Sequence, residues 1–128
     1  WAHLGIRTHI VGEITEPAIT EKDVLIVGSG SGSTLFPAAI AKKAHDIGAK
    51  VIHIGSSPVS PVGEVSSLMV RIPVRTKHYL ADEIDSAQPM TSLFEQSLLL
   101  LGDIVAKMII ERRGLDTKAL WRYHANLE

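Results

Sequence analysis

The sequence contains no cysteine, almost no net charge and no long apolar run. Without cysteine, the chain forms no disulfide, no thiolate metal site and no cysteine nucleophile. A formal net charge of −1 provides no basic field of the kind that attracts nucleic acid or an anionic membrane surface. The apolar run at 98–101 is far too short to cross a bilayer. These absences predict a cytoplasmic domain that binds neither nucleic acid nor membrane.

What is present is typical of one globular domain. The 128 residues are enough to bury a core, and 45% hydrophobic and 21% charged residues are ordinary proportions for a soluble protein. Near the start, Leu4-Gly5 resembles the last turn of a helix, with Gly5 where a positive φ is favourable. Only four residues precede this cap, so we expect the natural domain to begin upstream.

Hydrophobic patterning predicts a parallel α/β domain. The segments 24–27 and 51–54 are short, continuous and rich in Val and Ile, which is typical of strands covered on both faces. An apolar stripe of helical spacing runs from Leu35 to Ile47, with Pro37 in its first turn and Gly48 after its last. Strands that alternate with helices place the chain in the α/β class. The expected strands are 8–11, 24–27, 51–54 and 68–72, the expected helices are 35–47, 90–113 and 117–125, and 57–67 and 76–89 are expected loops.

A run of Gly and Ser at 28–34 stands between the second expected strand and the helix that follows it. At such a junction, backbone N–H groups converge at the helix N-terminus, and short hydroxyl side chains add donors. Ser29, Ser31 and Thr34 supply three hydroxyls on one turn, and Gly30 lets the backbone approach a ligand closely. The pattern predicts a site for one phosphate monoester. A flexible Gly/Ser linker is the alternative, and the strong flanking elements disfavour it.

Two other phosphate-binding loops fit this run less well. A Walker loop needs a lysine that reaches the β- and γ-phosphates, and here Gly32 is followed by Ser33 and Thr34. A dinucleotide loop has glycine at its first, third and sixth positions and an acidic residue at the end of the next strand. Gly28 and Gly30 match, but the sixth position is Ser33 and the next strand has no acid at its end. A nucleotide is therefore the weakest of the open alternatives.

The segment 29–34, Ser-Gly-Ser-Gly-Ser-Thr, resembles the phosphosugar loop of the sugar isomerase (SIS) domain family, commonly Ser-x-Ser-Gly-Glu-Thr. The spacing to 49–52, the Pro-rich segment 57–61 and the stretch 93–95 are similar, and the ending 123–128 resembles that of 6-phospho-3-hexuloisomerases. The resemblance covers essentially all 128 residues. It implies a three-layer α/β/α domain with a parallel flavodoxin-like sheet, usually in tetramers. It also implies isomerisation of D-arabino-3-hexulose 6-phosphate to fructose 6-phosphate without metal or cofactor, a step of the ribulose monophosphate pathway.

Two features depart from the family pattern. Ser33 stands where the family loop commonly has Glu, which removes a carboxylate beside the sugar site. The chain also lacks the family's upstream helices and first strand, whose Gly/Ser turn supplies another part of the pocket. We therefore expect 1–128 to form a single SIS domain that is incomplete at its N-terminus.

Isomerisation of a ketose requires a group that removes a proton beside a carbonyl and returns it to the neighbouring carbon. Glu95 is the first candidate, since it lies early in a largely apolar helix where water is expected to be scarce. From the residues alone, Glu95 could equally be present only because a carboxylate interacts favourably with the helix dipole. The resemblance to the family implies that Glu95 is the catalytic base. His124 is the second candidate for proton transfer, with a surface or interface histidine as the alternative. Thr91 and Ser92 are candidate sugar ligands, or caps of the long helix.

The other histidines carry weaker signals. His53 lies within an expected strand and His45 on an expected helix, so both are expected to be packing or solvated residues. His3, His9 and His78 form no metal-ligand spacing with acidic residues, and no metal site is expected.

The expected helix 90–113 is apolar around most of its circumference, so more than one side is expected to be buried. One side is expected on the sheet and another on a second copy, which predicts a homo-oligomer, dimer or tetramer. Three function classes stay open at this point. They are an isomerase of phosphorylated ketoses with Glu95 as base, a non-catalytic SIS module that senses a sugar phosphate, and a nucleotide-binding domain.

Overall fold

The structure is a computed structural model that describes residues 1–127. The chain forms two compact units, Ala18–Leu98 on the one hand and Trp1–Pro17 with the chain from Leu99 onward on the other. The long helix α3 (Ser92–Arg113) begins in the first unit and continues in the second.

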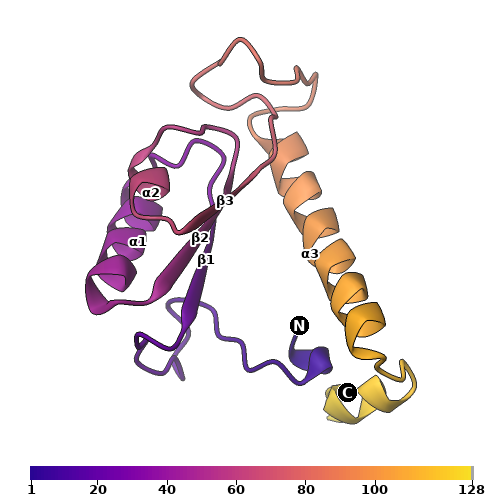
Figure 1. The fold of residues 1–128 in the computed structure, drawn as a ribbon. Coiled ribbons are helices and arrows are strands. Elements are labelled where there is room, and N and C mark those ends of the chain that lie inside the picture. The colour runs from indigo at the N-terminus through magenta and orange to yellow at the C-terminus, as the bar shows by residue number, and fades with distance from the viewer. Residues whose placement is uncertain (128) are drawn as a thin grey trace. The chain divides into compact units, whose positions relative to one another are not determined.

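A parallel sheet of three strands in the order β1-β2-β3 forms the first unit (Figure 1). The strands β1 (Val24–Gly28), β2 (Lys50–Gly55) and β3 (Leu68–Arg71) alternate with α1 (Leu35–Ile47) and the single turn α2 (Pro61–Glu64). Both helices lie on the same side of the sheet (Figure 1). The predicted parallel α/β class is confirmed.

The core of this unit lies between α1 and one face of the sheet. Leu25 and Val27 of β1 are buried in it, whereas Val24 and Ile26, on alternate positions, are 51% and 41% exposed. Within residues 1–127, β1 is therefore covered on one face, not on both as its composition suggested. The buried cluster consists of Leu25, Val27, Ala41, Ala44, Ala49, Val51 and Val62.

Helix α1 has the predicted boundaries. Gly48 ends it in the left-handed region at φ 97°, a conformation that glycine adopts without strain. Thr34 occupies the N-cap position, but its side chain makes no capping hydrogen bond.

The predicted strand 8–11 is wrong. These residues are exposed, and they belong to the unit in which no strand occurs within the described part of the chain. An extended segment becomes a strand only by pairing with another strand, and the three-stranded sheet of the first unit ends at β1 and β3.

Two predicted helices are shorter than expected. Helix α3 starts at Ser92 because Met90 has a φ of 52°, which is incompatible with a right-handed helix. The predicted helix 117–125 is the 3₁₀-helix η2 (Ala119–Tyr123), so His124 lies just beyond its end.

The second unit contains both ends of the described chain. The 3₁₀-helix η1 (Ala2–Leu4) stops at Gly5, which has a φ of 71°, as predicted, and η1 packs against η2. Among residues 1–127, no helix combines the length and apolar character needed to span a membrane.

Candidate functional site

The loop 28–34 leaves the carboxyl end of β1 and leads into α1. The N–H of Ser29 donates to the carbonyl of Ile54 near the end of β2 (2.9 Å), and the N–H of Ser56 donates to the carbonyl of Gly30 (2.8 Å). These bonds join the loop to the segment that follows β2, at the carboxyl edge of the sheet. In open parallel α/β sheets, ligands bind outside this edge.

The three hydroxyl side chains of the loop differ in their surroundings. Ser29 and Ser31 are 8% and 7% exposed, whereas Thr34 is exposed. The first backbone bond of α1 runs from the N–H of Ala38 to the carbonyl of Thr34 (3.0 Å). The amides of the first turn therefore have no partner within the helix, as at any helix start, and point toward the loop. Hydroxyls and amides together suit an anion.

Glycine at position 32 is required by both conformation and space. Gly32 has a φ of 61°, and a Cβ there would lie 2.2 Å from the Oγ of Ser60 and 2.9 Å from the Cε1 of His53. The carbonyl of Gly32 also accepts a hydrogen bond from the N–H of Val62 (3.1 Å). The loop is thus fitted closely against the segment that leads into α2.

His53 has a role that the sequence did not indicate. The ring is fully buried in β2, opposite Val27 of β1, and its Nε2–H donates to the carbonyl of Ser29 at 2.9 Å. Because a carbonyl only accepts, this contact assigns the proton to Nε2, and Nδ1 is buried without a hydrogen-bond partner among the described residues. The expectation of a packing residue was therefore incomplete, since His53 fixes the first turn of the loop.

Glu83 fastens the loop that follows β3 to the same edge. Its carboxylate accepts hydrogen bonds from the N–H of Thr76 (3.1 Å), the hydroxyl of Thr76 (3.0 Å), the N–H of Leu80 (3.0 Å) and the hydroxyl of Ser56 (2.8 Å). Desolvation acts to raise the pKa of Glu83, but these hydrogen bonds outweigh it and hold the pKa below its ordinary value.

An arginine ties the same loop to β3. The Nε of Arg71 donates to the carbonyl of Ser56 (2.8 Å), and its Nη1 lies 2.7 Å from a carboxylate oxygen of Asp82. The hydrogen bond from Arg71 lowers the pKa of Asp82. Sequence patterns gave no signal for Glu83 or Arg71, because their contacts depend on how the loop after β3 folds back and meets Ser56.

Ser33, which departs from the family pattern, is half-buried beside Ser31. Its hydroxyl lies 3.2 Å from the Oγ of Ser31 and 3.1 Å from the Nε2 of His78. His78 was among the histidines with weak signals, and the structure brings it to the predicted phosphate loop.

Glu95 lies in the first turn of α3, as predicted, but its side chain is exposed, so the expected water-poor surroundings are absent in the single chain. One carboxylate oxygen accepts from the hydroxyl of Thr91 (3.1 Å), and the hydroxyl of Ser92 donates to the carbonyl of Pro89 (2.7 Å). Neither hydroxyl caps a backbone N–H of the helix in these contacts. The neighbouring Phe94 is buried.

A contact with Phe94 brings the start of α3 to the loop. A Cβ on Gly30 would meet the Phe94 ring at 3.6 Å and the methyl group of Thr76 at 3.2 Å. Within the unit Ala18–Leu98, the structure thus brings together the predicted phosphate loop and the helical turn that carries Glu95.

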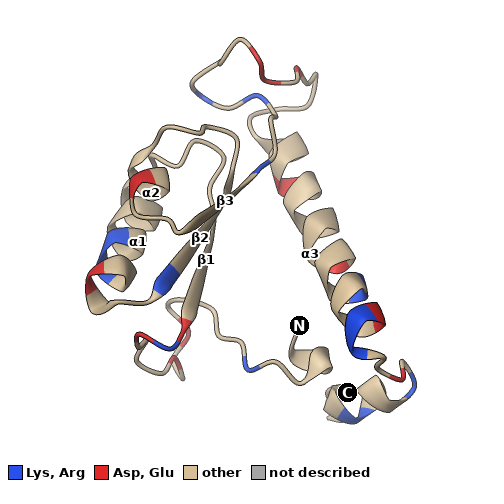
Figure 2. Ribbon diagram, in the orientation of Figure 1, with Lys and Arg blue, Asp and Glu red and all other residues tan. Residues whose placement is uncertain are grey.

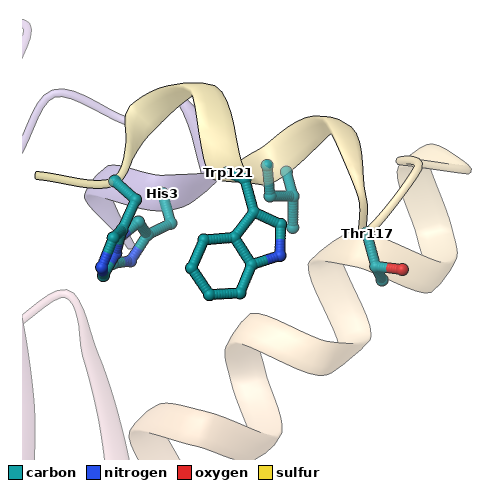
Figure 3. Close-up of a pocket in the computed structure, with 5 residues that line it drawn as sticks. His3, Thr117 and Trp121 are labelled. Atoms are coloured by element: carbon teal, nitrogen blue, oxygen red, sulfur yellow. The ribbon is translucent and has the colours of Figure 1, made fainter. Parts of the chain in front are cut away.

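His124 belongs to the second unit, where it contacts His3, one of the labelled residues of the pocket in Figure 3. The Nδ1 of His124 lies 3.0 Å from the Nε2 of His3, and the rings stack with centroids 5.2 Å apart. Both line an open cavity of about 210 Å³ with Thr117, Leu120 and Trp121. Among residues 1–127, no group of three or more His, Cys, Asp or Glu side chains is arranged to hold a metal ion.

The sequence profile of the SIS domain matches residues 8–100. The chain therefore belongs to the SIS domain family.

Within this family, the chain is similar to 3-hexulose-6-phosphate isomerases. It is 42% identical to the one from Bacillus subtilis, over 98% of this chain and 68% of the relative. It is 35% identical to the one from Mycobacterium gastri, over 98% of this chain and 63% of the relative. The chain thus spans about two thirds of the length of these relatives.

A solved structure gives the same picture. The crystal structure of a hypothetical protein from Methanococcus jannaschii, described as inferring a function as 3-hexulose-6-phosphate isomerase, matches with a TM-score of 0.82. It is 34% identical, over 98% of this chain and 66% of that one. Another crystal structure, of a hypothetical protein, matches with a TM-score of 0.87 at 30% identity over 98% of this chain and 66% of that one.

Proposed function

We propose that this chain is the phosphosugar-binding part of a 3-hexulose-6-phosphate isomerase, which interconverts D-arabino-3-hexulose 6-phosphate and fructose 6-phosphate. The observation that carries the proposal is the hydroxyl-rich loop at the carboxyl edge of β1, held beside the helical turn of Glu95. The similarity to curated isomerases along almost the whole chain supports the same substrate class.

Ser29, Gly30, Ser31 and Thr34 are the proposed phosphate ligands. The two buried serines lie in a loop whose backbone is fixed by His53 and by the segment after β2. Thr34 keeps its hydroxyl free of the helix cap, so it is available to a phosphate oxygen at the first turn of α1. This set of donors suits a dianionic phosphate monoester. Unlike a nucleotide, such a ligand has no nucleobase and no second phosphate that would need further contacts.

Glu95 is the proposed base. Its carboxylate removes the proton from C2 of the 3-ketose, which gives an enediol with its double bond between C2 and C3. The same proton returns to C3 while the hydroxyl proton moves from O2 to O3, leaving the carbonyl at C2. Atoms and electrons balance without an oxidant or reductant. The bond from Thr91 engages only one carboxylate oxygen, Oε1, which leaves Oε2 for the carbon acid.

His124, Thr91 and Ser92 are given supporting roles in this proposal. An imidazole can both donate and accept a proton, so His124 is assigned the transfer of the hydroxyl proton. Thr91 orients the Glu95 carboxylate through their 3.1 Å contact, and Ser92 is assigned to the sugar hydroxyls.

We also propose that the protein works as a cytoplasmic homo-oligomer and that this chain belongs to a single SIS domain. Several apolar side chains of α3 are exposed, among them Leu100, Ile104 and Met108. Figure 2 shows the charged residues of α3 gathered toward its C-terminal end, and none occurs between Glu95 and Asp103. An exposed apolar helix face of this kind fits a second copy of the chain.

A coupled assay that follows fructose 6-phosphate formation tests the function. Glu95→Gln is expected to lower kcat by roughly 10²- to 10⁴-fold, as removal of a catalytic base does. The matched control is Glu111→Gln on the same helix, an exposed glutamate paired with Lys107, which is expected to leave turnover unchanged. Turnover that survives Glu95→Gln would exclude this base. Binding of fructose 6-phosphate without any turnover would instead favour the non-catalytic sensor.

A further inference from the structure

Three side chains form a continuous hydrogen-bonded chain that ends at the predicted phosphate loop. The Nε2 of His78 lies 3.1 Å from the Oγ of Ser33, which lies 3.2 Å from the Oγ of Ser31. The N–H of Ser33 also donates to the Oγ of Ser31, at 3.3 Å. We call His78, Ser33 and Ser31 the hydroxyl chain.

The bond from the hydroxyl of Ser33 to the Oγ of Ser31 sets the direction of the hydroxyl chain. A serine hydroxyl has one hydrogen to donate and two lone pairs to accept with. Ser31 accepts from both the N–H and the hydroxyl of Ser33, so both of its lone pairs are used. Its own hydrogen is therefore directed to a further acceptor. Because the hydroxyl of Ser33 donates its one hydrogen to Ser31, the Nε2 of His78 is the donor in the contact between His78 and Ser33.

Every hydrogen in the chain thus points from His78 toward Ser31. Hydrogen bonds in a row polarise one another, so an anion at the end strengthens each bond before it. The three distances in this row lie between 3.1 and 3.3 Å.

The loop that carries His78 is held in place by its own contacts. The N–H of His78 donates to the hydroxyl of Thr76 (3.3 Å), and Thr76 is buried and bonded twice to Glu83. The next residue, Tyr79, has a φ of 49°, a costly conformation for a residue with a Cβ. The guanidinium of Arg75 stacks over its ring, 5.3 Å from the centroid. These contacts hold the backbone at His78, whose side chain is itself exposed.

We infer that His78 and Ser33 are positioning residues that orient the Ser31 hydroxyl as a donor to the substrate phosphate. The inference rests on the proposed function, because it takes the loop 28–34 as the phosphate site. In this account, Ser33 is a required link of the hydroxyl chain, and His78 donates the hydrogen bond that sets its direction.

Binding of inorganic phosphate and of fructose 6-phosphate, measured by calorimetry, tests the inference. His78→Phe keeps the ring size but removes the donor, and it is expected to raise Kd for both ligands about 3- to 10-fold, the effect of one lost hydrogen bond. Ser33→Ala is expected to have the same effect. His78→Gln, whose Nε2 can donate from a similar position, is expected to restore most of the affinity.

A double variant separates orientation from a merely structural role. Because the links act as a unit, Ser33→Ala combined with His78→Phe is expected to cost no more than either change alone. His45→Phe is the matched control, since His45 is an exposed histidine near the far end of α1. In turnover assays KM is expected to rise with kcat nearly unchanged, because the phosphate lies away from the reacting carbons.

The outcomes distinguish this inference from the proposed function. If Ser31→Ala weakens phosphate binding while His78→Phe and Ser33→Ala leave it unchanged, the phosphate site stands and the hydroxyl chain is overturned. If the losses of binding free energy from the two single changes add in the double variant, the hydroxyl chain is overturned as well. If the unaltered protein binds neither phosphate nor fructose 6-phosphate, both the proposed function and this inference fail.

Discussion

At the scale of single residues, the backbone of the phosphate loop depends on space at one position. Gly32 combines a left-handed φ of 61° with contacts that leave no room for a methyl group. Gly12 has a comparable φ of 94° but nothing within 4 Å of a Cβ. The two glycines therefore separate the cost of conformation from the cost of steric overlap.

Gly32→Ala is expected to lower the free energy of unfolding by about 2 to 4 kcal/mol, which sums left-handed strain and overpacking. Gly12→Ala is expected to cost only about 1 kcal/mol, from strain alone. Urea unfolding of both variants measures the difference. Equal costs at the two positions would mean that Ser60 and His53 move aside easily.

The residues of the site were predicted unequally from the sequence. Ser29, Ser31 and Thr34 were found because a local pattern of strand, Gly/Ser loop and helix requires hydroxyls there. His53 and Glu83 were missed because their roles depend on which loops the fold brings together. A strand histidine looks the same in sequence whether it packs or donates to a carbonyl 24 residues away.

At the scale of elements, local signals predicted boundaries well where a backbone requirement marks them. Helix α1 ends at Gly48, and α3 ends before Gly114, because both glycines have positive φ. The strand predicted at 8–11 failed because the composition of a short segment reflects a preference for extended backbone and not the presence of a pairing partner.

The loop 74–84 behaves as an element that one carboxylate holds together. Glu83→Gln replaces one acceptor oxygen with an amide NH2 group, so at least one of the four donors loses its partner. The free energy of unfolding is expected to fall by about 1 to 3 kcal/mol. Hydrogen exchange of the Thr76 and Leu80 amides is expected to become faster. Glu64→Gln, an exposed change on α2, is the control and is expected to alter neither.

The same loop gives a pH dependence. Since the folded-state pKa of Glu83 lies below its ordinary value, its carboxylate stabilises the folded chain above the ordinary pKa, near 4.3. That contribution is lost as the pH falls through the lowered folded-state pKa. Unfolding followed below about pH 4.3 is therefore expected to depend less steeply on pH in Glu83→Gln than in the unaltered protein. Identical slopes would contradict this account of the loop.

At the scale of the whole molecule, the apolar composition of the long helix predicted a homo-oligomer, and a single chain does not test that prediction. Leu100, Ile104 and Met108 are four residues apart and so form one row along α3. Each is more than half exposed, at 61%, 55% and 61%. A row of large apolar side chains in water is unfavourable unless another surface covers it, which is why we propose a homo-oligomer.

Size-exclusion chromatography with light scattering at micromolar concentration is expected to give a mass of at least two chains. Ile104→Glu places a charge in the middle of the row, where desolvation costs several kcal/mol, and is expected to shift the protein toward the monomer. Lys107→Gln is the matched control, because it removes only a surface ion pair with Glu111, worth less than about 1 kcal/mol. A monomeric mass for the unaltered protein would overturn the proposed assembly. An oligomer that both variants leave intact would move the interface away from this row.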